Sequence, residues 1–246
     1  MRLLVLDLET RPIEGRFWGL WGQNIGINQI TDPGGVLCFA AKFHDEAKMH
    51  FASQWDDGQA RMVRLAHKLL TEADAVAGWN SDKFDLRWLN RCFVEQGLSP
   101  PPPFVKVDLM KSVKRNVALP SYKLDFVARW LGVGAKQRTG GFDLWADVLA
   151  GDAKAQAKMG RYNRHDTRIT EQVFHKLSEK GWIRGLPNQA IEGGHCCPSC
   201  GSERLQRRGY QISKTRRYAR FQCRDCGAWS QATVCEPGGA KLKAVA

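Results

Sequence analysis

Two carboxylates lie in a largely apolar stretch, where they would not by themselves stabilise a fold. Residues 3–10 read Leu-Leu-Val-Leu-Asp-Leu-Glu-Thr, and side chains alternate between the two faces of a strand. Asp7 and Glu9 therefore share one face of a strand that is apolar on both sides. An unpaired carboxylate in a buried strand costs several kcal/mol, so a cation or another partner must meet it. The alternative is a strand end that reaches solvent with two ordinary surface acids.

Two further acids lie on apolar stripes of predicted helices. Asp85 begins a stripe over residues 85–96, and Asp166 lies in the middle of an apolar seam over residues 152–180. Tyr162 is one turn before Asp166 on the same face, so its phenol can reach whatever Asp166 binds. Oxygen ligands suit Mg²⁺ or Mn²⁺, and two such ions can activate a water and stabilise the leaving oxygen of a phosphodiester. The four acids therefore predict a divalent-metal site. Asp82 and Asp108 are interpreted as acids at helix starts.

The cysteines indicate a second metal site near the C-terminus. Four of the eight form two C-x-x-C pairs, and the pairs are 22 residues apart. Paired thiolates at this spacing favour one closed tetrahedral Zn²⁺ site, as in a zinc ribbon. His195, Cys196 and Cys235 complete no further pair and are treated as secondary candidates. The predicted zinc ligands are Cys197, Cys200, Cys223 and Cys226.

Basic and aromatic residues alternate between the two pairs, as they would in a β-hairpin. Residues 195–246 hold ten lysines and arginines against three acids, in a chain of formal net charge +12. This balance predicts a polyanionic partner, although a charged face kept for solubility gives the same composition. The predicted nucleic-acid contacts are Arg207, Arg208, Lys214, Arg216, Arg217 and Arg220, with Tyr210, Tyr218 and Phe221 for base stacking.

The chain length and the apolar segments predict one full domain and a small second module. No run approaches the 18 apolar residues of a membrane span, and Asp7 interrupts any signal-peptide core. Cysteine usage fits a reducing compartment, so we expect an intracellular, cytoplasmic protein. Strands are predicted at residues 3–10, 36–43, 47–55, 75–78 and 104–107, and helices at 59–71, 85–96, 121–131 and 152–180. Residues 11–32 are expected to be irregular.

The acids and their surroundings resemble the three exonuclease motifs of the DEDD superfamily of 3′–5′ exonucleases, tyrosine subtype. The motifs are D7-L-E9-T10, N80-S-D-K-F84-D85 and Y162-N-R-H-D166, in the family's order. Residues 119–132, LPSYKLDFVARWLG, resemble the segment before the third motif in exonuclease domains of family B DNA polymerases. The histidine subtype would need histidine at position 161, where this chain has arginine. The resemblance covers residues 1–182 and implies a ribonuclease H-like α/β fold, with a mixed five-stranded sheet flanked by helices.

The resemblance also implies a role for each site residue. Asp7, Glu9 and Asp166 would hold one Mg²⁺ or Mn²⁺, and Asp7 with Asp85 would contact the second. Tyr162 would orient the attacking water. Thr10 and Asn80 would touch the terminal nucleotide.

The predicted organisation is an exonuclease domain over residues 1–182, a linker over 183–194, a zinc ribbon over 195–235 and a tail over 236–246. The length leaves no room for a polymerase domain, so we expect a stand-alone 3′–5′ exonuclease acting on DNA, with a ribbon that binds nucleic acid. An RNA-specific or endonucleolytic enzyme on the same scaffold is one alternative, since the metal site only addresses phosphodiester chemistry. A non-catalytic nucleic-acid-binding protein is another. Besides nucleic acid, the second expected partner of this protein is a protein of DNA replication or repair.

Overall fold

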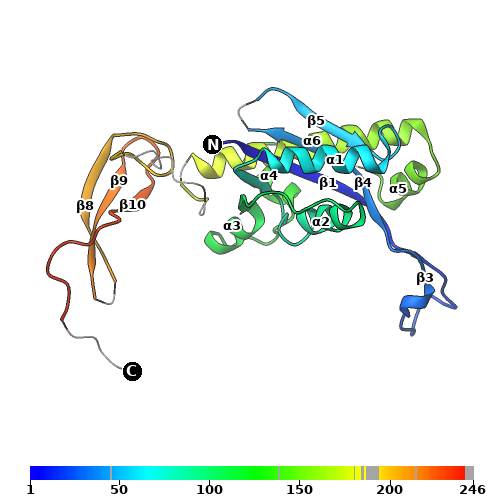
Figure 1. Ribbon diagram of the computed structural model, residues 1–246, viewed down its shortest axis with the longest axis horizontal. Coiled ribbons are helices and arrows are strands. Elements are labelled where there is room, and N and C mark those ends of the chain that lie inside the picture. The colour runs from blue at the N-terminus through cyan, green and yellow to red at the C-terminus, as the bar shows by residue number, and fades with distance from the viewer. Residues whose placement is uncertain are drawn as a thin grey trace. The chain divides into compact units, whose positions relative to one another are not determined.

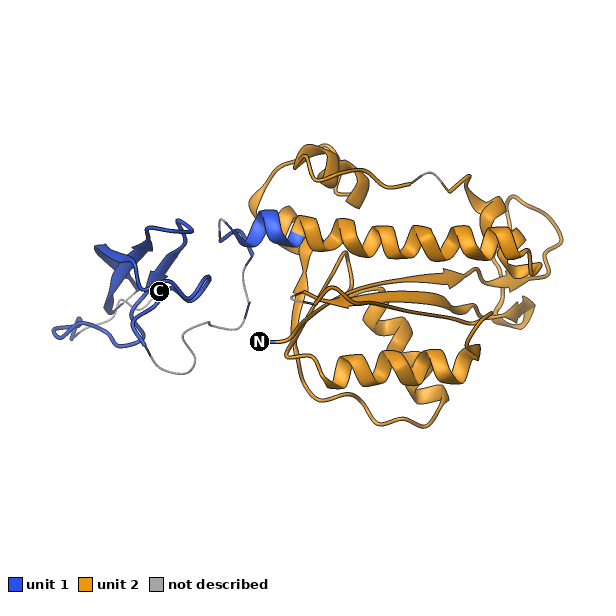
Figure 2. Ribbon diagram, turned by 90° about the horizontal axis from the view of Figure 1, so that it is seen from above, with its two compact units in different colours: residues 1, 174–246 blue, residues 2–173 orange. Residues whose placement is uncertain are grey.

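The structure is a computed structural model that describes residues 1–44, 46–137, 139–179, 181–183, 186, 194–213 and 215–241. The chain divides into two compact units. The larger unit comprises residues 2–173, and the ribbon unit comprises residue 1 and residues 174–246 (Figure 2). Most of the predicted linker over 183–194, the last five residues of the predicted tail and Lys214 lie outside the described residues.

A five-stranded mixed sheet forms the centre of the larger unit (Figure 1), in the order β5-β4-β1-β6-β7. The central strand β1 (Leu3–Arg11) pairs antiparallel with β4 (Gly35–Phe43) and parallel with β6 (Ala75–Gly78). The outer strands are β5 (Met49–Ser53) and β7 (Val105–Asp108). The register between β1 and β4 shifts between Glu9 and Thr10, at the end of the strand that carries the acids.

Helices cover both faces of this sheet (Figure 2). Leu4, Leu6 and Leu8 point to one face, where they pack with buried side chains of α1 (Gly58–Thr71) and α2 (Asp85–Glu95). Leu37 and Cys38 point to the other face and pack against α5 (Phe142–Leu149) and α6 (Ala153–Ser178). The side chains on the two faces of the strands thus build two cores. Leu37 and Cys38 are consecutive but share one core, because the register of β4 against β1 shifts at Leu37. The acids of β1 lie on the α6 side of the sheet.

The predicted five-stranded sheet flanked by helices is confirmed, with differences in its shorter elements. The helix predicted over 121–131 is the shorter α4 (Leu124–Trp130), and α3 (Leu109–Asn116) and α5 were not predicted. Each has eight residues or fewer, so its apolar pattern covers only about two turns. Asp108 caps α3, because its side chain accepts a hydrogen bond from Lys111 N.

The segment expected to be irregular forms an arm that extends from β1 and β4 (Figure 1). It contains the short strands β2 (Glu14–Gly15) and β3 (Ile30–Asp32), which pair antiparallel, and a single 3₁₀ turn, η1 (Ile27–Gln29). Trp18 in this arm is 99% exposed. The apolar side chains of the arm lie outside the two cores of the larger unit.

The ribbon unit contains an antiparallel three-stranded sheet in the order β10-β9-β8. Strands β8 (Leu205–Ile212) and β9 (Arg217–Cys223) form the predicted hairpin, and β10 (Trp229–Gln231) adds the third strand. Its small core consists largely of buried cysteines, so the packing depends on what those thiols bind. No helix in the described part of the chain is long and apolar enough to cross a membrane.

Candidate active site

Three carboxylates from two distant segments converge on the α6 side of the sheet. Asp7 and Glu9 come from β1, and Asp166 comes from the middle of α6. One oxygen from each lies within 4.8 Å of the others. Asp166 is completely buried, and its Oδ1 receives no hydrogen bond from the described residues. A buried carboxylate oxygen without a donor is the ligand that a divalent cation requires, so this group fits Mg²⁺ or Mn²⁺.

Neighbouring groups hold two of the acids in place. Asn163 lies on α6, three residues before Asp166. It donates from Nδ2 to Asp7 Oδ2 at 2.7 Å and to the Asp7 carbonyl at 3.1 Å. Asp85 is buried at the start of α2, where its Oδ1 accepts from Leu8 N at 3.1 Å. The structure thus places Asp85 beside β1, next to the group formed by the other three acids. The sequence analysis missed Asn163, although its position within the third motif was a usable signal.

The crowding of these acids shifts their proton affinities. Burial, followed by the charges of Glu9, Asp85 and Asp166, raises the pKa of Asp7 well above its ordinary range. Burial raises the pKa of Glu9 to about 8 against the opposing effect of Lys136, and burial raises that of Asp85 to about 7. Without a cation, the site therefore takes up protons near neutral pH. This response is typical of carboxylates arranged for a metal.

Lys136 supplies a positive charge that the sequence did not indicate. Its Nζ lies 2.5 Å from Asp166 Oδ2 and donates to Tyr162 Oη at 3.0 Å. Burial opposes the charge on Lys136, but the Asp166 carboxylate and the Tyr162 phenol outweigh it, so the pKa of Lys136 is raised. Burial and the Asp166 charge also raise the pKa of Tyr162. The phenol therefore stays protonated and can serve as a hydrogen-bond group, not as a base.

Two hydrogen bonds fix the loop that carries Lys136. Lys136 N donates to Asp125 Oδ1 at 2.7 Å, and His165 Nε2 donates to the Ala135 carbonyl at 2.9 Å. His165 is adjacent to Asp166 in sequence, and its ring is hydrogen-bonded to this loop. The loop has no periodicity and no motif, so only the folded chain reveals its role.

The two residues expected at the terminal nucleotide lie at the ends of strands. Thr10 follows the register shift of β1, and its carbonyl accepts from Trp145 Nε1 at 3.0 Å. Asn80 follows β6 with φ +62°, a left-handed conformation that asparagine tolerates better than most residues. Its N donates to Asp108 Oδ1 at 3.2 Å, so the same carboxylate that caps α3 also fixes this turn.

The four predicted zinc ligands converge in the ribbon unit. Their sulfur atoms all lie within 4.8 Å of one another, and the pairs Cys197–Cys226 and Cys200–Cys223 are each 3.7 Å apart. A tetrahedron with Zn–S bonds of about 2.3 Å has sulfur–sulfur edges of about 3.8 Å. The thiols therefore fit one Zn²⁺. His195 packs its ring against Phe221 at 4.9 Å.

The predicted nucleic-acid contacts of the ribbon occupy β8, β9 and their connection, apart from Lys214, which is outside the described residues. They do not share one face. Arg207 and Arg217 place their guanidinium carbons 5.3 and 4.9 Å from the Tyr210 ring centroid, whereas Arg220 lies 4.8 Å from that of Trp229. Arg207 is also paired with Glu236 at 2.8 Å.

Comparison with known proteins agrees with this architecture. Residues 29–178 match the family model described as RNase_H superfamily. The chain belongs to the RNase_H superfamily. Its fold places the acids of the first strand against the last long helix, as the resemblance to exonucleases implied, and this RNase H-like nuclease fold supports nuclease activity.

A solved structure shows the same fold over most of this RNase_H superfamily chain. It is the family B DNA polymerase from the hyperthermophilic archaeon Pyrobaculum calidifontis, with a TM-score of 0.57 and 20% sequence identity. The match covers 87% of this chain and 32% of the polymerase chain, so the likeness concerns about one third of that protein. None of the curated proteins compared with the chain matches it significantly in sequence.

Proposed function

We propose that this protein is a metal-dependent 3′–5′ exonuclease that hydrolyses the terminal phosphodiester of DNA. The observation that carries the proposal is the group of Asp7, Glu9 and Asp166, whose oxygens lie within 4.8 Å of one another in an RNase H-like fold. The fold similarity to a DNA polymerase supports DNA as the substrate.

The acids would hold two Mg²⁺ or Mn²⁺ ions. Asp7, Glu9 and Asp166 are the proposed ligands of one ion, and Asp7 with Asp85 are those of the second. Bound there, the ions would lower the pKa of a water and stabilise the negative charge on the leaving oxygen. The hydrogen bond from Asn163 leaves Asp7 Oδ1 available to them, because it is made to Oδ2.

Tyr162 and Lys136 are proposed to position the nucleophile and the scissile phosphate. The phenol accepts a hydrogen bond from Lys136 and stays protonated, so its own O–H can orient a water beside Asp166. The Lys136 ammonium stands next to that carboxylate and can contact an anionic phosphate oxygen when a metal ion takes over the charge of Asp166. Thr10 and Asn80 are proposed to contact the terminal nucleotide.

The ribbon is proposed to hold nucleic acid with one structural Zn²⁺ at its four cysteines. Its excess of guanidinium groups supports this role, since phosphate neutralisation supplies most of the sequence-independent affinity for nucleic acid. The proposed boundaries are residues 1–182 for the exonuclease, 183–194 for the linker and 195–235 for the ribbon.

Gel analysis of labelled oligonucleotides tests the proposed reaction. DNA labelled at its 5′ end is incubated with the protein and Mg²⁺ or Mn²⁺, in parallel with RNA of the same sequence. A ladder of products shortened from the 3′ end of DNA is expected, and Asp7→Asn should abolish it. Internal cuts would favour the endonuclease alternative, preference for RNA would reassign the substrate, and uncut DNA and RNA would contradict the proposal.

A further inference from the structure

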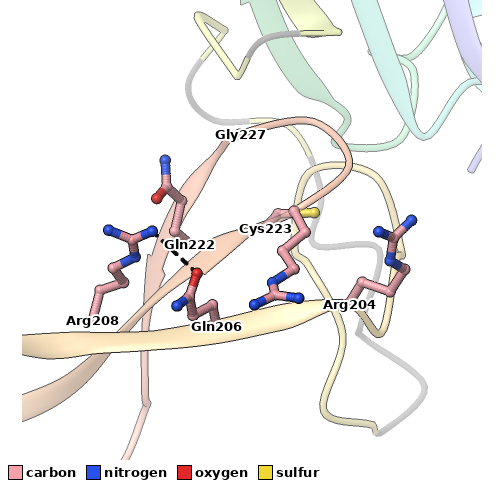
Figure 3. A pocket seen from close by; sticks show the side chains of 7 residues that line it. Arg204, Gln206, Arg208, Gln222, Cys223 and Gly227 are labelled. Carbon is pink, nitrogen blue, oxygen red and sulfur yellow. Dashed lines mark hydrogen bonds between the residues drawn. The ribbon is translucent and has the colours of Figure 1, made fainter.

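The ribbon unit contains a pocket that the nuclease site does not explain. Its volume is about 420 Å³, within the range of about 300–1,000 Å³ for small-ligand sites. Figure 3 shows Arg208 directed toward Gln206, and Arg208 Nη2 donates to Gln206 Oε1 at 3.1 Å. Because the amide oxygen is engaged, the amide NH₂ of Gln206 is left to donate to a ligand. The pocket is lined by Arg204, Gln206, Arg208, Gln222, Cys223, Arg224 and Gly227.

The strand register extends this pocket to an exposed indole. Gln206 lies opposite Gln222, and Gln222 lies opposite Trp229 on β10. Residues opposite one another on antiparallel strands share a face, so the three form one row across the sheet. Trp229 is 52% exposed, and Arg220 lies over its ring. We call this side the Trp229 face; it comprises Arg204, Gln206, Arg208, Arg220, Gln222, Arg224 and Trp229.

On the opposite side of the sheet, which we call the Tyr210 face, the side chains already contact other groups of the protein. This face comprises Arg207, Tyr210, Arg217 and Phe221. Arg207 lies opposite Phe221 there, and Tyr210 already has the guanidinium groups of Arg207 and Arg217 near its ring. Glu236 neutralises Arg207 at 2.8 Å. Phe221 has the ring of His195 against it. On this Tyr210 face, therefore, the rings and one of the cations have partners within the protein.

The Trp229 face also carries guanidinium groups that have no carboxylate partner in the described part of the chain. On the Trp229 face, Arg204 is paired with Asp225 at 2.7 Å. No carboxylate of the described residues lies within 4.0 Å of the guanidinium nitrogens of Arg208, Arg220 or Arg224. Three guanidinium groups without a carboxylate, together with amide donors, form a site for an anion with several acceptor oxygens. Trp229 beside it has one guanidinium group near its ring, that of Arg220, where Tyr210 has two, and it is 52% exposed against 39% for Tyr210. Trp229 is therefore the ring with more free surface on which a base can stack.

We infer that single-stranded nucleic acid binds the ribbon on its Trp229 face, with a backbone phosphate in the pocket and a base on Trp229. The inference rests on the proposed function for the choice of nucleic acid as ligand. It assigns binding roles to Gln206, Gln222, Arg224 and Trp229, and it takes Tyr210 and Phe221 out of the stacking surface.

Matched variants of the two faces test this inference in the full-length protein. Binding of a fluorescent oligo(dT) is measured by anisotropy with zinc present and without added Mg²⁺ or Mn²⁺. Arg208→Ala with Arg224→Ala removes two cations from the Trp229 face, and Arg207→Ala with Arg217→Ala removes two from the Tyr210 face. Zinc content and circular dichroism confirm that each ribbon has folded.

The Trp229-face pair should raise Kd about tenfold and reduce the slope of log affinity against log salt by about 0.7, the value for one lost phosphate contact on a single strand. The Tyr210-face pair should change Kd less than about threefold. Trp229→Ala should weaken binding about tenfold, Trp229→Phe should restore most of it, and Tyr210→Ala should have little effect.

Equal losses from the two faces, or a larger loss from the Tyr210 face, would overturn the inference. Unchanged oligonucleotide binding in all variants would also overturn it, and would favour an acidic protein as the ligand of the pocket. The binding assay needs no cleavage. Failure of the wild-type protein to cut DNA would therefore count against the proposed function alone, and wild-type affinity of the Trp229-face variants would count against this inference alone.

Discussion

Lys136 Nζ lies 2.5 Å from Asp166 Oδ2, so the protein places a cation of its own beside the buried carboxylate. Lys136→Met would leave Asp166 without this charge. The free energy of unfolding of the metal-free protein should then fall by about 1–3 kcal/mol, less than for a fully buried pair because the Lys136 side chain is 31% exposed. Added Mn²⁺ should restore part of the loss. Urea unfolding with and without Mn²⁺ measures both effects. Arg161→Met is the control, because Arg161 is exposed on α6, the helix that carries Asp166. An equal fall in the free energy of unfolding in the two variants would show that the contact between Lys136 and Asp166 does not stabilise the metal-free protein.

Asp7→Asn should abolish cleavage without disrupting the fold. Asparagine keeps the oxygen that accepts from Asn163 but loses the charge proposed to contact both ions. Loss of several kcal/mol of transition-state stabilisation corresponds to a rate reduction of about a thousandfold. Replacing a carboxyl group whose pKa is raised in the folded state by a neutral amide should also raise the melting temperature of the metal-free protein at pH 8, because the unfolded state releases this proton more readily than the folded state. The proposed ligand role would be wrong if the variant cut labelled DNA within tenfold of the wild-type rate.

Tyr162→Phe should lower kcat by about a hundredfold and change KM little, because the ring stays packed while the hydroxyl that would position the water is lost. Steady-state kinetics on a short DNA measures the two constants. Tyr122→Phe is a matched control, since the Tyr122 hydroxyl donates to the Val117 carbonyl. An unchanged kcat in Tyr162→Phe would identify Tyr162 as a packing residue.

The stability of the metal-free protein should fall as the pH rises from about 4.5 to about 8. Burial raises the pKa of Glu9 from its ordinary 4.5 to about 8 and that of Asp85 from 3.8 to about 7. Over this interval the folded state retains protons that the unfolded state has released, so deprotonation opposes folding. Bound metal should remove the penalty, and the rise in melting temperature on adding Mg²⁺ should therefore be larger at pH 8 than at pH 6. The same profile measured on Glu9→Gln is the comparison; a profile as steep as that of the wild type would show that Glu9 contributes none of it.

Cys223→Ser should release the zinc and unfold the ribbon. Metal analysis should find one zinc per wild-type chain and almost none in the variant, and oligonucleotide affinity should fall with it. Cys235→Ser provides the control, since Cys235 is a free, half-buried thiol outside the four-sulfur cluster. If Cys235→Ser also lost zinc, the assignment of the four ligands would need revision.

Local periodicity was enough to predict the parts of the fold that carry the acids. The alternation over residues 3–10 placed Asp7 and Glu9 on one face of β1, and the seam of α6 placed Tyr162 and Asp166 one turn apart. The motifs then related these segments to one another. Both predictions depend on patterns that extend over at least eight residues.

The remaining features depend on contacts between distant segments. Lys136 reaches the site only because Asp125 and His165 hold its loop, and no local pattern records those hydrogen bonds. The two faces of the ribbon were likewise not separable, since a bulge between Arg207 and Tyr210 shifts the register of β8. A bulge changes which side chains share a face, and alternation along the sequence does not reveal it.

The hydrogen bond between Asp7 and Asn163 joins residues that are 156 positions apart. A ribosome that adds about 5–20 residues per second needs roughly 8–30 seconds to pass from one to the other. During that time the first strand has emerged, but its carboxylates lack both the amide that fixes them and the aspartate that completes their group. A nascent chain of this protein therefore lacks the assembled group of acids until the middle of α6 has left the ribosome.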